Sequence, residues 1–463
     1  MLIRAENIEY TYPGNERCAL KDVNLTIDSG EYIVITGNNG SGKSTLALVL
    51  AGVIEPDSGN VFLDGKNIFS HDIDENWRSD IGFLFQDPRE GILGTSVERD
   101  IAFGPENLAL PLDRLRKKVD ELVERFGLQD YRKSPVEHLS GGMVERCALA
   151  SAIATDPRII ILDEPDSFLD FEGKIMLNEE ISKLLDSGKA ILHITQSDII
   201  GDKNYHMDNG NLISQNKSFP KIVFRIAKNC QHHDEILSAK QIKFSYDGKT
   251  ALDNITMAIY EGCGTAILGR SGSGKTTLAR VLSELYKPDS GQIESHGKVG
   301  ISFQFPERQL FAETVIKDVQ FGPQSLQLDS PEIFAQQALN RMNVPEEYWN
   351  RSPFLLSDGE QRRVGIAGLL AVSPRCLIFD EPTATLDINQ KLNFIKLVNE
   401  LKSEGTAIAV ITHDLNIASA CCSSAVVLDR GRIIYAGEMK KLLDDRKFRN
   451  NLGLGTEEDL SEV

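Results

Sequence analysis

Two stretches of this 463-residue sequence have the residue types and the spacing needed to hold phosphate groups. GNNGSGKST begins at Gly37 and GRSGSGKTT begins at Gly269, and both fit the pattern G-x-x-x-x-G-K-[ST]. Glycines let backbone N–H groups approach phosphate oxygens, and the N-terminus of the following helix attracts anions. Lys43 and Lys275 are predicted to reach the β- and γ-phosphates of a nucleotide. The predicted phosphate-binding residues are Gly37, Asn38, Asn39, Gly40, Ser41, Gly42, Lys43, Ser44 and Thr45 in the first loop, and Gly269, Arg270, Ser271, Gly272, Ser273, Gly274, Lys275, Thr276 and Thr277 in the second.

An acidic pair ends an apolar run in each half of the chain, in IIILDE and in CLIFDE. Such a pair can be a solvated strand end, but beside a phosphate loop we interpret it as catalytic. The first carboxylate is predicted to hold Mg²⁺ through water, together with a hydroxyl of the phosphate loop. The second is predicted to orient or deprotonate the attacking water. The predicted metal-binding residues are Asp163 with Ser44 and Asp380 with Thr276, and the predicted bases are Glu164 and Glu381.

The motifs occur twice in the same order, which indicates one domain repeated along the chain. Each phosphate loop follows a strand-like run (EYIVIT, CGTAIL) and precedes a helix-like run (STLALVL, TTLARVL). This alternation predicts parallel α/β domains. The predicted boundaries are 1–218 for the first domain, 219–235 for a linker and 236–463 for the second domain. The first copy has extra polar residues around 66–80, which are predicted to form turns.

The composition is that of a soluble globular protein, with 41% hydrophobic and 25% charged residues. No apolar run approaches the ~20 residues that are needed to cross a bilayer, so the chain is not expected to span a membrane itself. The formal net charge of −18 argues against extensive binding to nucleic acid, which requires a basic surface.

The order of motifs resembles that of the ATP-binding-cassette (ABC) ATPases over nearly the whole chain, in two copies. Each phosphate loop is followed by a glutamine, by LSGG or LSDG and by the acidic pair, and the second copy ends this series with a histidine after a strand. The resemblance implies ATP and Mg²⁺ as cofactors. It also implies two tandem ABC ATPase cassettes, each a P-loop α/β core with an antiparallel β subdomain and a helical signature subdomain. The further catalytic residues that it implies are Gln86, Gln304 and His413, of which the two glutamines also contact the metal.

The family also places a tyrosine against adenine near the start of each cassette. Tyr12 and Tyr246 stand at those positions here, in EYTYPG and KFSYDG. Stacking of an aromatic side chain on a base is worth roughly 1–3 kcal/mol.

In ABC ATPases the cassettes pack head to tail, so that each ATP lies between one phosphate loop and the signature of the other cassette. The implied signature contacts are Ser140, Gly141 and Gly142 in the first cassette and Ser357 and Gly359 in the second. The second signature departs from the pattern, because Asp358 stands where the first has Gly141. At ~5 Å from the γ-phosphate and an effective dielectric constant of ~20, the extra negative charge costs about 3 kcal/mol.

The switch histidine of the family, His413, has Gln196 as its counterpart in the first copy. Glutamine can donate a hydrogen bond but cannot become cationic. Head-to-tail packing would bring Gln196 and Asp358 into the same composite site. We therefore predict that this site is degenerate and that the site of Glu381 and His413 is complete, with tolerated sequence drift as the alternative.

The segment after each glutamine resembles the part of energy-coupling-factor (ECF) transporter ATPases that meets the coupling helices of a membrane scaffold. FQFPERQLFAETVIKDVQFGPQS occupies 303–325, and the similar segment FQDPREGILGTSVERDIAFGPEN at 85–107 has Gly91 in place of Gln309. The resemblance implies a peripheral motor on the cytoplasmic side of a prokaryotic cell membrane, where ATP hydrolysis drives uptake of a vitamin or metal ion.

The implied partners are a hydrophobic transmembrane scaffold subunit and a solute-binding membrane subunit, and no nucleic acid is expected. A fused sugar-importer ATPase is one alternative. A twin-cassette ATPase that acts in translation or DNA repair, without a transport role, is the other.

Overall fold

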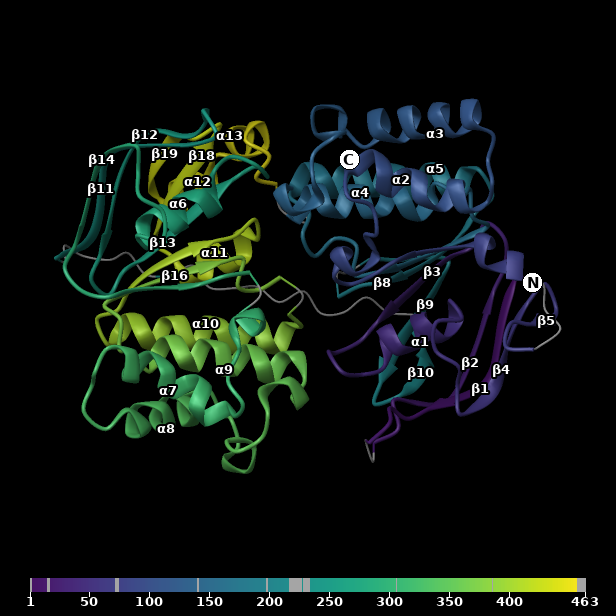
Figure 1. Ribbon diagram of the computed structural model, residues 1–463, viewed down its shortest axis with the longest axis horizontal. Helices are drawn as coiled ribbons and strands as arrows, with labels where there is room; N and C mark the ends of the chain where they lie inside the picture. Colours follow the sequence, from purple (N-terminus) through teal and green to yellow (C-terminus); the bar gives the residue numbers. More distant parts are fainter. Residues whose placement is uncertain are drawn as a thin grey trace. The chain divides into compact units, whose positions relative to one another are not determined.

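The computed structural model describes residues 2–14, 17–70, 75–139, 141–196, 199–215, 227, 234–304, 306–384 and 386–455. The chain divides into two compact units, Met1–Ile222 with Thr385–Asn389 and Val223–Ala384 with Gln390–Val463. Most of the predicted linker lies outside the described residues. Both units contain a mixed sheet, a smaller antiparallel sheet and a group of helices (Figure 1), which confirms the predicted α/β class with the same architecture twice.

The mixed sheet of the first unit has the strand order β10-β9-β3-β8-β7-β6. Its neighbouring strands are parallel except for β10, which pairs antiparallel with β9. The strands are β3 (Tyr32–Thr36), β6 (Ile81–Leu84), β7 (Ile159–Asp163), β8 (Ala190–Ile194), β9 (Lys203–Asp208) and β10 (Asn211–Ser214). β7 is buried at every position because its residues pack alternately into two apolar cores, one on each face of the sheet. Ile160 and Leu162 join the core beneath the helices, whereas Ile159 and Ile161 join the core beneath the antiparallel sheet.

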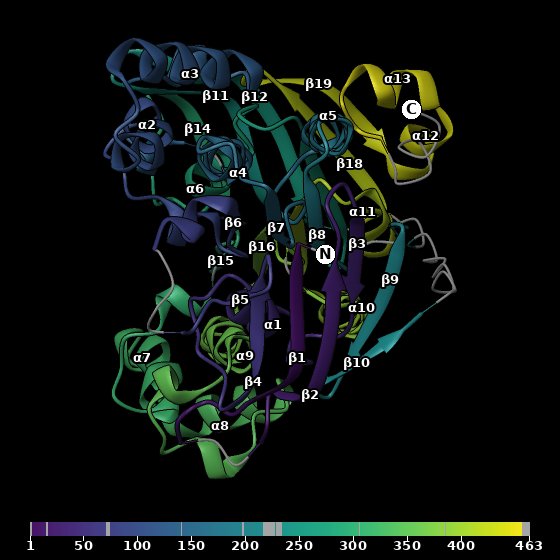
Figure 2. The same cartoon turned by 90° about the vertical axis from the view of Figure 1, so that its right-hand side faces the viewer.

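The antiparallel sheet of the first unit has the order β2-β1-β4-β5, and Figure 2 shows β1, β2 and β4 side by side. Its strands are β1 (Ile3–Tyr10), β2 (Leu20–Ile27), β4 (Ser58–Leu63) and β5 (Lys66–Asn67). The helices are α1 (Lys43–Leu50), α2 (Val97–Asn107), α3 (Leu112–Arg125), α4 (Gly141–Ile153) and α5 (Phe171–Asp186), with short 3₁₀ helices η1 (Glu75–Asp80), η2 (Pro88–Gly91), η3 (Gln129–Tyr131) and η4 (Val136–His138). The described residues of the insertion around 66–80 include β5 and η1 in addition to the predicted turns, and Trp77 of η1 packs against Gly52.

The mixed sheet of the second unit repeats this plan in the order β15-β16-β17-β13-β18-β19. Its strands are β13 (Gly264–Gly269), β15 (Val299–Ser302), β16 (Cys376–Asp380), β17 (Ala407–Ile411), β18 (Ser424–Asp429) and β19 (Arg432–Glu438). The antiparallel sheet consists of β11 (Glu235–Tyr246), β12 (Lys249–Tyr260) and β14 (Ser290–Ser295), with β11 in the middle. Alternate residues of β16 again enter two cores, Leu377 and Phe379 on one side and Cys376 and Ile378 on the other.

The helices of the second unit follow the same order, with an addition at the C-terminal end. They are α6 (Lys275–Leu282), α7 (Val315–Ser325), α8 (Pro331–Arg341), α9 (Asp358–Leu370), α10 (Ile388–Ser403), α11 (Leu415–Cys421), α12 (Met439–Asp444) and α13 (Arg446–Asn451), with η5 (Pro306–Gln309), η6 (Glu346–Tyr348) and η7 (Pro353–Leu355). Figure 1 shows α7, α8 and α9 grouped together, and they share one apolar core. In the described part of the chain, no helix is both long and apolar enough to cross a membrane.

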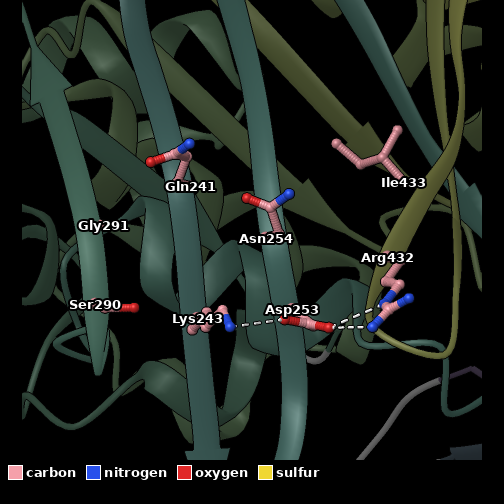
Figure 3. Close-up of a pocket in the computed structure, with 8 residues that line it drawn as sticks. All are labelled: Gln241, Lys243, Asp253, Asn254, Ser290, Gly291, Arg432 and Ile433. Atoms are coloured by element: carbon pink, nitrogen blue, oxygen red, sulfur yellow. Dashed lines mark hydrogen bonds and ion pairs between the residues drawn. The ribbon is translucent and has the colours of Figure 1, made fainter.

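A charged network ties the antiparallel sheet of the second unit to the last strand of its mixed sheet (Figure 3). Asp253 of β12 accepts a hydrogen bond of 2.9 Å from Nε of Arg432 on β19, and Nζ of Lys243 on β11 lies 3.4 Å from the same carboxylate. The hydrogen bonds from Arg432 and Lys243 lower the pKa of Asp253. These three side chains line a shallow surface cavity of ≈ 660 Å³ together with Gln241, Asn254, Ser290, Gly291 and Ile433. The network therefore helps to fix the antiparallel sheet, which carries Tyr246, against the core that carries the phosphate loop.

Candidate active site

The first phosphate loop connects β3 to α1, so its backbone N–H groups lead into a helix N-terminus. Gly42 has a φ of 109°, and a Cβ there would lie 2.4 Å from the carbonyl oxygen of Ala19. Only glycine fits this position without a shift of the backbone. The buried Lys43 donates from Nζ to the carbonyl oxygens of Gly37 at 2.8 Å and Asn38 at 3.0 Å. Its ammonium group is thereby held at the loop, where a phosphate group would lie.

The second phosphate loop connects β13 to α6 and repeats this geometry. Nζ of Lys275 donates to the carbonyl oxygens of Gly269 at 2.7 Å and Arg270 at 2.9 Å. One contact has no counterpart among the described residues of the first unit: Nη2 of Arg270 donates at 2.8 Å to the carbonyl oxygen of Asn451, the last residue of α13. The other predicted residues lie on the same two loops and helix starts, with Asn39, Gly40, Ser41, Ser44 and Thr45 in the first and Ser271, Gly272, Ser273, Gly274, Thr276 and Thr277 in the second.

The two predicted adenine-stacking tyrosines lie above equivalent points of the two phosphate-loop helices. The Tyr12 hydroxyl is 3.2 Å from Oγ1 of Thr45, and the Tyr246 hydroxyl is 3.4 Å from Oγ1 of Thr277. Both tyrosine side chains are partly exposed, so a ring face is available to a planar base. Because each hydroxyl reaches the helix that begins with the lysine predicted to bind phosphate, a nucleotide held there by its phosphates would bring its base close to the tyrosine.

Asp163 and Asp380 end β7 and β16, and each carboxylate is buried beside the hydroxyl of the adjacent phosphate loop. Burial raises the pKa of each to about 6, and hydrogen bonds with Ser44 and Thr276 oppose that rise. One oxygen of each carboxylate, Oδ1, has no hydrogen-bond partner among the described residues. Buried oxygen atoms of this kind fit Mg²⁺, which when bound would neutralise phosphate charge during hydrolysis.

The predicted glutamines lie at the same sheet edge as these aspartates. Gln86 follows β6 by two residues and Gln304 follows β15 by two residues. β6 is the parallel neighbour of β7, and β15 is the parallel neighbour of β16. Since the carboxyl ends of parallel strands meet at one edge, each glutamine is brought near the aspartate of its own cassette.

The glutamates that follow the aspartates have different partners in the two cassettes. Glu164 accepts hydrogen bonds from Nε2 of Gln196 at 2.7 Å and from Oγ of Ser167 at 3.2 Å. Oε2 of Glu381 instead lies 3.1 Å from Nδ1 of His413. Gln196 and His413 therefore occupy equivalent places, and each contacts the carboxylate that is predicted to act as the base.

These partners give the two carboxylates different acidities. Burial raises the pKa of Glu164 to about 7, and the hydrogen bond from Gln196 and the charge of Lys43 offset only part of this effect. Burial acts on Glu381 in the same direction, but the contacts with His413 and the charge of Lys275 outweigh it and lower its pKa below the ordinary value. At neutral pH, Glu381 is therefore a carboxylate and able to accept a proton, whereas Glu164 is divided between its two forms.

The signature residues lie at the start of α4 and α9. Gly141 and Gly142 begin α4, and Gly359 lies in the first turn of α9, whereas Ser140 and the side chain of Asp358 are outside the described residues. Ser357 caps α9, and its hydroxyl donates to Oε2 of Glu360 at 2.8 Å while its N–H donates to the same oxygen at 2.9 Å. Sequence reasoning missed Glu360, although the spacing S-x-x-E is the pattern of a capping box. The predicted pairing of each phosphate loop with the signature of the other cassette stays a prediction.

Known proteins have sequences similar to that of this chain. The sequence model of the ABC transporter family matches residues 20–167 and 252–384. A Bifidobacterium longum protein named "Putative ABC transporter ATP-binding protein" is 31% identical over 88% of this chain and 63% of its own length. A Bacillus subtilis protein named "Putative HMP/thiamine import ATP-binding protein" is 27% identical over 95% of this chain and 92% of its own length. This chain thus spans somewhat less than two thirds of the first relative and most of the second.

Solved structures show the same fold at lower sequence identity. In a model of ribosome-bound archaeal Pelota and ABCE1, one chain superposes with a TM-score of 0.72 at 20% identity, covering 96% of this chain and 80% of that chain. The structure described as RNase-L inhibitor superposes with a TM-score of 0.65, also at 20% identity, and covers 96% of this chain and 93% of its own. Likeness at this identity shows a shared twin-cassette fold.

Proposed function

Since this chain belongs to the ABC transporter family and is an ATPase, we propose that it is the motor subunit of an ECF-type importer, in which ATP binding and hydrolysis drive uptake of a vitamin or metal ion. Two ATP molecules would draw the cassettes together, and hydrolysis with product release would separate them again. The solute would be selected by a membrane subunit, because the sites described above serve the nucleotide. The motor would act on the cytoplasmic side of the membrane as a peripheral subunit.

The hydrolytic step is assigned to named residues of each cassette. The lysine of the phosphate loop neutralises the β- and γ-phosphates, and the glutamate accepts a proton from the attacking water. We propose that the second cassette's Glu381 performs most turnover, since His413 supports its carboxylate form. The first cassette's Glu164 would contribute less, because burial leaves it partly protonated despite the hydrogen bond from Gln196. ATP could still bind to the first cassette, whose Lys43 and Tyr12 are in place.

The observation that carries the transport proposal is an apolar surface on the segment after Gln304. Phe311 and Phe321 are 60% and 52% exposed, and their rings meet edge to face at 4.8 Å. Oδ2 of Asp318 accepts hydrogen bonds of 2.8 Å from the N–H groups of Phe311 and Ala312, which fixes the turn that presents Phe311. Exposed aromatic pairs held in this way are typical of interaction surfaces.

The first cassette presents the same arrangement in its own helical part. Leu93 and Phe103 are exposed. Oδ1 of Asp100 accepts hydrogen bonds from the N–H groups of Leu93 at 2.8 Å and Gly94 at 2.9 Å. A repeated apolar projection beside each catalytic glutamine suits a pair of hydrophobic coupling helices from a membrane scaffold. Movement of the cassettes would then reach the membrane through these segments.

The alternatives receive less support. The solved twin-cassette structures named above include a ribosome-bound protein, but their 20% identity supports only the fold. The net charge of −18 disfavours a nucleic-acid surface. A fused sugar-importer ATPase would share the chemistry, so the partners rather than the ATPase activity must separate it from the ECF type.

Co-expression with candidate membrane subunits tests the proposal. We expect the chain to sediment with membranes only when an ECF scaffold subunit and a solute-binding subunit are present. Phe311→Ser should reduce that recovery at least fivefold, because a central apolar anchor of an interface typically contributes 2 kcal/mol or more. Charge reversal at Glu307 and Arg308, on the same segment, should also weaken the association.

The matched control is Leu285→Ser, which removes a side chain that is 55% exposed in the loop after α6, a loop that is not part of the proposed docking segment. Full membrane recovery of the Phe311 variant would refute docking through this segment. Recovery of the wild-type chain with ribosomes instead of membranes would favour the translation alternative.

A further inference from the structure

The signature helix of the second cassette holds the loop that follows the catalytic glutamate. Arg362 of α9 is only 8% exposed. Its Nη2 donates to the carbonyl oxygen of Pro382 at 2.7 Å, and its Nη1 donates to that of Ala384 at 3.2 Å. Pro382 directly follows Glu381. A planar guanidinium that donates to two carbonyls of one turn fixes both the position and the orientation of that turn.

The same helix is also packed closely against the segment that carries Gln304. A Cβ on Gly365 of α9 would already lie 2.9 Å from the carbonyl oxygen of Pro306, the first residue of η5. The charge of Glu307, the next residue of η5, supports the ionised form of Arg362, although burial lowers the pKa of the guanidinium. Arg362 therefore lies where the signature helix, the segment after Gln304 and the loop after Glu381 meet.

The first cassette has the opposite kind of side chain at this position. Glu145 of α4 corresponds to Arg362 in the paired signature segments, and it is 2% exposed. Neither of its carboxyl oxygens has a hydrogen-bond partner among the described residues. Burial raises its pKa well above the ordinary value, and Asp166 and Asp87 add to that rise. Among the described residues, Glu145 therefore makes no side-chain hydrogen bond that could replace the connection Arg362 provides in the second cassette.

We propose that Arg362 is a positioning residue for ATP hydrolysis in the second cassette. It ties the loop after Glu381 to the signature helix and so places the Glu381 carboxylate where it can accept a proton from the water that attacks ATP. The replacement of this arginine by Glu145 makes the first cassette's glutamate less firmly placed. This inference rests on the ATPase activity and on the role of Glu381, and it is independent of the transported solute. Because Arg362 acts through Glu381, its removal should slow the chemical step and leave nucleotide binding intact.

The test is steady-state ATP hydrolysis by the purified full-length chain, with kcat and KM measured for each variant. Arg362→Gln should lower kcat about tenfold or more, because a small misplacement of a catalytic group can cost up to ~100-fold, while KM stays within about twofold. Arg362→Lys should retain a higher kcat than Arg362→Gln, since an ammonium group can still donate to one carbonyl oxygen. It lacks the planar guanidinium that donates to the carbonyl oxygens of Pro382 and Ala384 together. The matched control, Glu145→Gln, replaces a buried carboxylic acid by an amide of the same shape and should leave kcat within about twofold.

A double variant separates positioning from general damage to the fold. In a Glu381→Gln background, Arg362→Gln should cause no further loss of activity, because the group that it positions is already absent. Losses that multiply in the double variant would overturn the proposal, as would a kcat of Arg362→Gln within twofold of the wild type. If Arg362→Gln cannot be recovered as a folded chain, Arg362→Lys decides the matter, and a wild-type kcat in that variant overturns the proposal.

Discussion

Replacing each glutamate that is proposed to act as the base by glutamine tests whether the two cassettes contribute unequally. Glu381→Gln removes a carboxylate that His413 keeps ionised, and we expect the steady-state rate at saturating Mg-ATP to fall by roughly 10²-fold or more. Glu164→Gln removes a carboxyl group that is partly protonated and bonded to Gln196, and we expect a loss of no more than about twofold. The two changes are sterically equivalent, so each variant serves as the control for the other.

The pH dependence of the two variants should differ in a defined direction. Glu164 has a pKa of about 7, so its base form is scarce below that pH and predominates above it. The ionised fraction of such a group rises about tenfold between pH 6 and pH 8. The residual activity of Glu381→Gln, which we attribute to the first cassette, should therefore rise about tenfold over this interval. Glu164→Gln should lack that rise, because Glu381 has a lowered pKa and stays ionised throughout.

The assay is phosphate release by the full-length chain at several pH values, with nucleotide binding measured separately to confirm that each variant still takes up ATP. Equal losses in the two variants would show that ATP hydrolysis depends equally on both sites and would refute the asymmetry. A flat pH profile in Glu381→Gln would refute the raised pKa that burial gives to Glu164.

Two further predictions concern binding and assembly. Lys43→Ala should weaken ATP binding or its coupling to cassette movement more than it lowers kcat, because the first site is proposed to bind ATP without supplying most turnover. Titration with a fluorescent ATP analogue measures the binding. A kcat as low as that of Glu381→Gln would contradict this division between the two sites. Because one chain carries both cassettes, Glu381→Gln with ATP should show the mass of one chain by size-exclusion chromatography with light scattering, and a stable mass of two chains would mean that the cassettes pair between chains.

The sequence was sufficient where the chemistry depends on neighbours along the chain. The phosphate loops are local structures, since glycines with positive φ, a lysine and a helix start are all specified within nine residues. Apolar runs that end in an acidic pair likewise predicted buried strands, and β7 and β16 are buried at every position. Repetition of the series then gave the fold class, because two copies with the same order of strands and helices build the same architecture.

Only the tertiary structure decided how the two copies differ in their contacts. Glu164 and Glu381 follow similar strands, but their acidities depend on Gln196 and His413, which arrive from strands 30 or so residues further along the chain. Arg362 gave no signal in the sequence, since a charged residue on a helix is ordinarily exposed. Its role follows from the folded loop, where two backbone carbonyl oxygens accept hydrogen bonds from one buried guanidinium. Every residue has a backbone carbonyl group, so the sequence cannot show which of them lie near Arg362.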